Sequence, residues 1–216
     1  MRLDKLLSDR STHRVNANTR HRIVTTAMDL FWEKGFQSTS VADILSRSQV
    51  HSGSLYHFFP GKQDVLAAVL EAYRDGIEEW LLKPAWSGVD DPIERIFALL
   101  NGYRTQLITT DCSYGCPIGS LALELHEPDP RIRDLLAANF ANWTGAIERC
   151  LGEAGARLPA ELDRHRLAEF TLSVMEGAVM QARTYRDIAS FDGNIAVLRE
   201  HVDMLIDQAK AERVPA

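Results

Sequence analysis

The chain has 216 residues, 45% hydrophobic and 25% charged, an ordinary balance for a globular protein with one large or two small cores. Its apolar runs are too short for a membrane span, and the segment from Met1 to Thr19 lacks the features of a secretory signal. Three cysteines do not suggest a disulfide framework, so we expect a cytoplasmic protein with reduced thiols. The net charge of −6 is uneven: residues 1–65 hold nine Lys/Arg and six Asp/Glu, and the remainder holds 15 and 24, so only the N-terminal part would attract nucleic-acid phosphates.

Helical periodicity dominates, and no segment shows the sustained alternation of a strand, so we expect an all-α fold of about nine helices. Residues 1–16 are polar and of mixed charge, which favours a flexible arm. The first helix is predicted over 19–34, where Ile23, Ala27, Leu30 and Phe31 form one apolar stripe. Gly35 then supplies a left-handed cap that ends the helix.

Two short helices follow. Ser40 and Asp43 form a capping-box pattern that opens the second helix, which ends near Arg47, and a third is predicted over 52–58. After Pro60 and Gly61, a long helix is expected over 62–82, stopping before Pro84. Two short helices joined by a tight turn and braced by a longer one indicate a helix-turn-helix arrangement.

The larger C-terminal part holds five more expected helices. Prolines lie near four of the starts, where the missing N–H costs nothing: Pro92, Pro117, Pro130 and Pro159. The predicted ranges are 91–110, 117–127, 129–152, 160–187 and 192–212.

The third helix has the composition of a groove reader. Glycine inside a helix costs about 1 kcal/mol relative to alanine, so Gly53 indicates that another backbone must come close. Tyr56 adds a ring and a hydroxyl, and short or medium polar side chains suited to phosphates and base edges surround the glycine: His51, Ser52, Ser54 and His57.

The other side of this region is expected to face the core: Val50 and Leu55 would pack with Ile44 and Phe59. Lys62 at a helix start suits an anion. The alternative is an ordinary solvated three-helix cluster.

Several motifs in order resemble the N-terminal domain of TetR-family regulators. They are Gly35-Phe36, the run from Thr39 to Ile44, the run from Ser52 to Phe59, and Lys62. The resemblance implies an all-helical homodimer whose third helix reads the DNA major groove and whose larger domain binds an inducer. It also implies a DNA-binding domain over 17–77, with the helix-turn-helix motif at 40–59, and a ligand-binding and dimerisation domain over 78–216.

Carried onto this chain, the resemblance implies that Thr39 and Ser40 touch phosphate, that the groove face runs from Val50 to Ser54, and that the backbone is clamped by Tyr56, His57 and Lys62. Two departures stand out. The usual glycine of the turn is Gln49 here, which must take the left-handed conformation at some cost. The usual Tyr-x-His-Phe order is changed to Tyr56-His57-Phe58-Phe59.

The last two helices are predicted to pair two subunits. The last helix carries a heptad-like seam, and the helix before it is apolar on more than one face. These two helices from each subunit would form a four-helix interface, unless both are buried within one subunit. The predicted interface residues are Phe170, Val174, Gly177, Ala178, Ile195, Leu198, Val202 and Leu205.

Aromatic residues and methionines in the middle of the chain indicate an apolar pocket for a neutral or weakly polar ligand, although such residues also fill ordinary cores. The predicted lining is Phe97, Tyr103, Cys116, Leu121, Phe140, Trp143 and Met175.

The Gly115-Cys116-Pro117 sequence resembles an LmrA/YxaF-like, multidrug-type subgroup of the same family. Because Cys116 precedes a helix start, the helix dipole would lower its pKa and make it a sensor of electrophiles or oxidants, alone or with Cys112; the alternative is an inert buried thiol. A zinc site is disfavoured, since these cysteines lack two further ligands at suitable spacing even with His126 near.

The sequence therefore predicts a ligand-responsive repressor that binds a near-palindromic double-stranded operator as a homodimer and is released by a small-molecule inducer. A thiol sensor using Cys116 is the alternative. An all-helical enzyme is a distant one, because the candidate acid–base residues form no metal or nucleophile motif: Glu124, His126, Glu127, Glu161 and His165. No cofactor, metal or membrane contact is expected.

Overall fold

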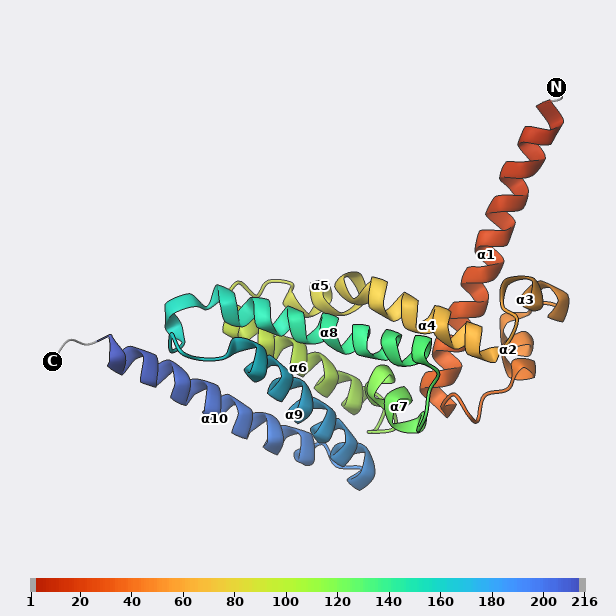
Figure 1. Cartoon of the computed structure of the whole chain (residues 1–216). Coiled ribbons are helices and arrows are strands. Elements are labelled where there is room, and N and C mark those ends of the chain that lie inside the picture. The colour runs from red at the N-terminus through yellow and green to blue at the C-terminus, as the bar shows by residue number, and fades with distance from the viewer. Residues whose placement is uncertain (1–2, 214–216) are drawn as a thin grey trace. The chain divides into compact units, whose positions relative to one another are not determined.

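The computed structural model describes residues 3–213 and the side chains of residues 18–213, and the described chain is helical (Figure 1). The helices are α1 (Leu3–Lys34), α2 (Val41–Ser48), α3 (Ser52–Phe58), α4 (Lys62–Ile77), α5 (Lys83–Trp86), α6 (Pro92–Thr109), α7 (Pro117–Glu124), α8 (Pro130–Glu153), α9 (Arg164–Tyr185) and α10 (Ala189–Glu212). A π-helical segment (Glu78–Leu82) joins α4 to α5, and a 3₁₀ turn (Gly155–Arg157) follows α8. The all-α prediction is confirmed.

The chain divides into two compact units. The head unit consists of Met1–Tyr73 with Ser120–Leu135, and the body unit consists of Arg74–Gly119 with Leu136–Ala216. Helices α4, α7 and α8 each begin in one unit and end in the other. The second stretch of the head unit, Ser120–Leu135, was not anticipated from the sequence, which placed a single domain boundary after residue 77.

The head core is the one that the apolar stripe of α1 predicts. Ile23, Ala27, Leu30 and Phe31 are all buried. They share the core with Ile44, Val50, Leu55 and Phe59 from the two short helices and their ends, as expected. Each fully buried side chain of this size contributes about 1.5–3 kcal/mol, so the stripe fixes α1 against α2 and α3.

Most helix ends follow the local signals. Gly35 has φ +84°, the left-handed cap that ends α1. Ser40 and Asp43 form the predicted capping box, with the Ser40 Oγ accepting from the Asp43 N–H and the Asp43 carboxylate accepting from the Ser40 N–H. Three of the four prolines are the first residues of helices: Pro92, Pro117 and Pro130.

Three boundaries differ most from expectation. Helix α1 runs back to Leu3 through the segment predicted as an arm, where neither glycine nor proline interrupts it. The helix after Lys62 continues past Pro84, because this proline lies in the first turn of α5 after the π-helical segment, where its missing N–H is tolerated. Helix α9 begins at Arg164 rather than 160, because the Asp163 carboxylate caps it by accepting from the Arg166 N–H.

In the body unit, α9 and α10 pack side by side as the closest helix pair, and both contact α6 (Figure 1). The core between them is apolar and contains Leu99, Leu100, Ala178, Leu198 and Val202. None of the helices in the described part of the chain is both long enough and apolar enough to span a bilayer.

Candidate nucleic-acid interface and ligand site

Helix α3 presents a polar face. His51, Ser52, Gly53, Tyr56 and His57 are exposed, and Ser54 is half-buried. The opposite side is fixed in the core by Leu55, which is fully buried, and by Phe59. His51 is the N-cap residue, and its side chain makes no capping hydrogen bond. The predicted residues therefore lie together on one accessible surface.

Gly53 has no role inside the fold that would require glycine. A Cβ atom built at this position meets no atom within 4 Å, and the residue has no left-handed backbone conformation. An alanine here would be favoured by about 1 kcal/mol from helix propensity. A reason outside the described chain, such as the close approach of another backbone, explains the glycine better than packing does.

The turn between α2 and α3 adopts the conformation expected from its departure from the family pattern. Gln49 has φ 52° and ψ 41°, the left-handed region that glycine usually fills. The guanidinium of Arg22 donates to the carbonyl oxygens of Ser48 (2.5 Å) and Gln49 (3.0 Å). These charge-assisted bonds offset the strain of the turn. The role of Arg22 was not predictable from the sequence, because its partners are backbone atoms 26 and 27 residues along the chain.

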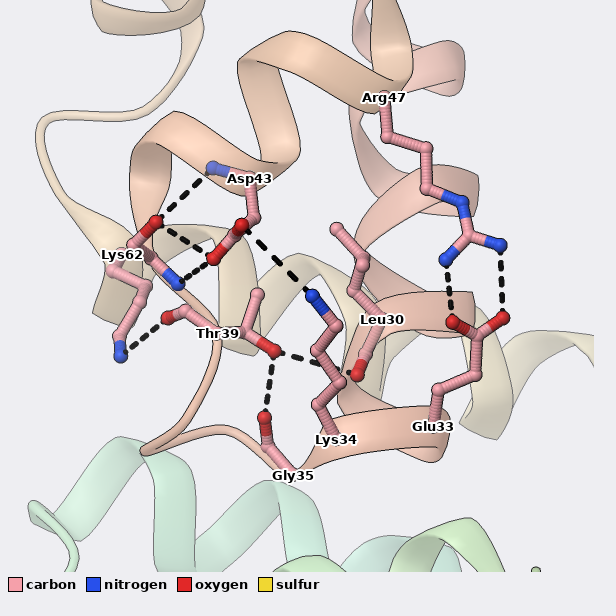
Figure 2. A network of polar contacts seen from close by, with 9 residues as sticks. Leu30, Glu33, Lys34, Gly35, Thr39, Asp43, Arg47 and Lys62 are labelled. Atoms are coloured by element: carbon pink, nitrogen blue, oxygen red, sulfur yellow. Dashed lines mark hydrogen bonds and ion pairs between the residues drawn. The ribbon is translucent and has the colours of Figure 1, made fainter.

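Two predicted DNA contacts are buried and serve the fold instead. The Thr39 side chain is fully buried, and its hydroxyl faces the carbonyl oxygens of Gly35 (2.7 Å) and Leu30 (3.3 Å), as Figure 2 shows. Val50 belongs to the head core. Ser40 remains exposed, although its hydroxyl is engaged with Asp43 in the capping box. Of the predicted phosphate contacts near α2, Ser40 alone is accessible.

Lys62 also acts within the head unit. Its ammonium donates to the carbonyl oxygen of Thr39 (2.9 Å), as Figure 2 shows. It also donates to the carbonyl oxygen of Phe36 (2.8 Å) and lies 4.2 Å from the centre of the Phe36 ring. Partial burial lowers the pKa of Lys62, and the charge of Glu124 opposes this effect. This placement favours a bracing role for Lys62 over the predicted phosphate clamp.

The same loop is held from its other side by Glu124, at the end of α7. The two carboxylate oxygens accept from the backbone N–H groups of Phe36 (2.8 Å) and Gln37 (2.6 Å). We call the contacts of Lys62 and Glu124 with residues 36–39 the loop brace. A carboxylate that accepts two backbone N–H bonds is a strong, directional anchor. The sequence offered no local signal for it, since 87 residues separate Gln37 from Glu124.

Part of the positive charge of the head unit is neutralised internally. Arg47 forms a bidentate pair with Glu33, which lowers the pKa of that carboxyl, and Lys34 lies 3.9 Å from Asp43 (Figure 2). Arg20 is exposed, with its guanidinium 5.4 Å from the centre of the Phe59 ring. Attraction of phosphate is therefore expected to depend more on Arg20 than on Lys34 or Arg47.

The body unit contains a buried polar cluster, which we define as Tyr103, Cys116, Trp143 and Glu176. Burial raises the pKa of the Tyr103 hydroxyl well above its ordinary value, with further contributions from Cys116 and Glu176, while the Trp143 indole lowers it. Three of the cluster residues were predicted to line a pocket. Glu176 was missed because a single carboxyl inside an apolar helical pattern gives no periodic signal.

Glu176 lies directly against the backbone of Gly119. A Cβ atom at Gly119 would lie 2.1 Å from Oε2 of Glu176, so any other residue here would force the carboxyl end of Glu176 to move. Burial raises the pKa of Glu176, and the Cys116 thiol, which donates toward the carboxyl, acts in the opposite direction. The cluster therefore holds a carboxyl group whose pKa lies above its ordinary value.

The other predicted pocket residues are not among the groups that act on the cluster. Phe97 is covered by the guanidinium of Arg199 from α10, 3.3 Å from the ring centre, and Met175 is fully buried in the core. Phe140 is half-buried, and Leu121 falls in the head unit. The structure therefore brings together Tyr103, Cys116 and Trp143 but not the whole predicted lining.

The structure argues against a reactive thiol. Cys116 is buried, and its pKa is raised far above the ordinary value, first by burial and then by the charge of Glu176. We expected the helix start to lower this pKa, but desolvation outweighs the dipole. Cys112 and Cys150 are also free and buried. Among the described residues, no group of His, Cys, Asp or Glu could hold a metal ion.

Part of the predicted dimer seam is buried within the single chain. Leu198 and Val202 are buried within the body unit, as is Ala178 on α9, because this stripe of α10 already covers the neighbouring helix. Ile195, Leu205 and Gly177 are half-buried, whereas Phe170 is half exposed. A groove on the outer side of α9 and α10 is lined instead by residues including Phe170, Val174, Val197, His201 and Met204.

Comparison with known proteins agrees with this architecture. Residues 23–69 match the model of the bacterial regulatory proteins of the tetR family, and residues 92–194 match that of the LmrA/YxaF-like transcriptional regulator C-terminal domain. An HTH-type transcriptional regulator of Mycobacterium tuberculosis is 32% identical over 80% of this chain and 88% of its own. The HTH-type transcriptional repressor DhaR of Mycobacterium sp. is 24% identical over 84% and 90%. A crystal structure of a TetR regulatory protein from Rhodobacter sphaeroides superposes with a TM-score of 0.76 and 26% identity, covering 84% of this chain and 97% of that one.

Proposed function

This chain belongs to the TetR family of bacterial transcriptional regulators, with an LmrA/YxaF-like C-terminal domain, and from that premise we propose that it is a ligand-responsive repressor. It is a regulator and not an enzyme, as the family establishes. In the proposal, a homodimer binds a near-palindromic operator, and a small molecule in the body unit releases it.

The observation that carries the proposal is the exposed face of α3. A glycine that the fold does not need lies among accessible hydroxyl, imidazole and phenol groups, on a helix whose other side is fixed in a core. A helix of this kind fits the B-DNA major groove, where its N-terminal residues reach base edges. Ser52 and Ser54 suit either bases or phosphates, and Tyr56 suits the backbone.

Homodimer formation is supported by the outer groove of α9 and α10. Phe170, Val197 and Met204 are between about half and two thirds exposed. On α10, Val197 and Met204 are seven residues apart with His201 between them, and on α9, Phe170 and Val174 are spaced by four, so each helix places apolar side chains on the face that lines the groove. A second copy related by two-fold symmetry would cover both faces with the same surface.

Regulation is proposed as a shift between two conformations. A ligand releases the operator only if it binds the non-binding conformation more tightly than the binding one. The repressor assignment is supported by the relative named as a repressor.

The DNA-binding proposal is tested by selecting bound fragments from random double-stranded DNA with the purified full chain. The expected result is an enriched inverted repeat with half-sites about one helical turn apart, about 34–36 Å. Affinity for that repeat should fall steeply as salt is raised, because phosphate contacts release counterions. Retained fragments that share no sequence, or no retained DNA even at low salt, would overturn the proposal.

The dimer surface is tested with Phe170→Glu, which places a charge in the apolar groove. The variant should sediment as a monomer under conditions in which the wild type is a dimer, with an unchanged circular dichroism spectrum. Ile108→Glu is the matched control, since Ile108 is equally exposed on α6 but lies outside the groove. A dimeric F170E protein, or an I108E protein that dissociates equally, would contradict the assignment.

A further inference from the structure

Two buried polar atoms in the polar cluster make no hydrogen bond of ordinary distance and angle among the described residues, although the Trp143 indole lies close enough to the Tyr103 hydroxyl to lower its pKa. They are the indole N–H of Trp143 and the carboxyl oxygen Oε1 of Glu176. Trp143 is only 4% exposed, so bulk water does not satisfy its donor. Buried polar groups are nearly always paired, and each unpaired one costs roughly 1–3 kcal/mol. One orphan is a donor and the other belongs to an acid, so the missing partner has complementary groups.

The charges around Glu176 narrow the chemistry of that partner. From α6, the Tyr103 hydroxyl faces the cluster, and from the segment before α7 the Cys116 thiol does so. The pKa of Glu176 is governed by burial and by that thiol, with no contribution from a cation. Arg183, two turns further along α9, packs its Cδ by Gly115 and is not among the groups that act on Glu176. Because a charge is costly to bury without a partner, a cationic group brought by a ligand would offset the burial of this carboxyl group.

The aromatic groups favour the same sign of charge. Trp143 and Tyr103 carry ring faces that attract cations, by about 0.5–2 kcal/mol depending on desolvation. A carboxyl group and two aromatic rings together disfavour an anion and favour an ammonium or amidinium group. The unpaired indole N–H adds a need for one hydrogen-bond acceptor on the same molecule.

We propose that the polar cluster is the binding site of a basic ligand, an apolar aromatic molecule that carries a protonated nitrogen for Glu176 and a hydrogen-bond acceptor for Trp143. The inference rests on the proposed function, because it assigns the chemical class of the inducer. It replaces the neutral or weakly polar ligand expected from the apolar residues alone. Gly119 contributes to the site, since a larger residue there would displace the carboxyl group of Glu176 from its present position.

The site is tested by calorimetric titration of the full chain with three compounds that share a phenoxyalkyl body: phenoxypropylamine, phenoxypropanol and phenoxybutanoate. They carry a cation, a neutral hydroxyl and an anion at the same end, and each has an ether oxygen as acceptor. We expect the amine to bind at least tenfold more tightly than the alcohol, and the carboxylate to bind most weakly.

The matched variants are Glu176→Gln, which removes the charge at nearly constant shape, and Glu169→Gln, which does the same at a solvent-accessible carboxyl of α9. E176Q should abolish the tenfold preference for the amine and leave alcohol binding unchanged, while E169Q should behave as the wild type. Trp143→Phe should weaken the amine and the alcohol by similar factors, because both lose the donor to the ether oxygen.

Equal affinities for the three compounds, absence of amine binding, or an amine preference that survives E176Q would each overturn the proposal. The wild-type compound series keeps the test decisive even if a variant does not fold. Failure here is separable from failure of the proposed function, since E176Q should still bind the DNA that the wild type selects. A protein that binds the amine but no DNA would refute the regulator proposal and not this site.

Discussion

Replacing Gly53 with alanine tests whether this glycine is required by the fold or by a binding partner. In the free protein, the added methyl group meets no atom within 4 Å, so nothing offsets the helix propensity of alanine. The variant should therefore be more stable than the wild type by up to about 1 kcal/mol. If a DNA backbone approaches this position, the same methyl group holds the duplex away and weakens contacts of the neighbouring residues.

The loss of DNA affinity should be about 10- to 100-fold, equivalent to about 1.4–2.8 kcal/mol. Stability is measured by urea denaturation followed by tryptophan fluorescence, and affinity by anisotropy of a labelled copy of the selected DNA. Gly102→Ala in α6 is the matched control, because its Cβ also meets no atom within 4 Å. It should gain similar stability and bind DNA as the wild type does. A stabilised G53A protein with unchanged affinity would refute the assignment of α3 as the groove reader.

Three further outcomes test the internal contacts. Lys62→Ala should lower the free energy of unfolding by about 1–2 kcal/mol through lost charge-assisted bonds, whereas Lys34→Ala, which loses one exposed pair, should cost less than about 1 kcal/mol in the same urea titration. Gly119→Ala should destabilise by about 1–3 kcal/mol in that assay because its Cβ overlaps Glu176, and adding Glu176→Ala should recover part of the loss; strict additivity would contradict the overlap. Because burial raises the pKa of Glu176, the folded protein holds this proton more tightly than the unfolded chain, so stability is lost as pH rises from the ordinary 4.5 through the raised value. Glu176→Gln should therefore match the wild type in thermal melts at about pH 4 and exceed it at about pH 8, and a constant difference at both would argue against the assigned shift.

The sequence was informative wherever structure depends on neighbours along the chain. Pro92, Pro117 and Pro130 each begin a helix, and Gly35 ends one, because caps and first turns involve residues a few positions apart. The strain at Gln49 was also predictable, since a missing glycine in a fixed turn leaves few backbone choices.

What escaped prediction depends on distant pairs. Thr39 matches a family motif, but burial decided its role, and burial is set by α1 packing against α2. The burial of Leu198 and Val202 escaped prediction for a related reason: α10 has apolar residues on two faces, and periodicity alone does not tell which face its own subunit covers. Glu176 lies in a helix whose pattern gives no hint of the glycine against which its carboxyl rests.

The loop brace changes how such regulators can be recombined. Glu124 holds the Phe36 and Gln37 N–H groups, and Arg131 pairs with Asp64 and Glu71, so the DNA-reading part depends on anchors encoded some sixty to ninety positions later. A graft that transplants the first seventy-odd residues onto a foreign effector domain would leave these anchors behind. Chimeras that also carry Ser120–Leu135 should retain operator recognition where simple head exchanges lose it.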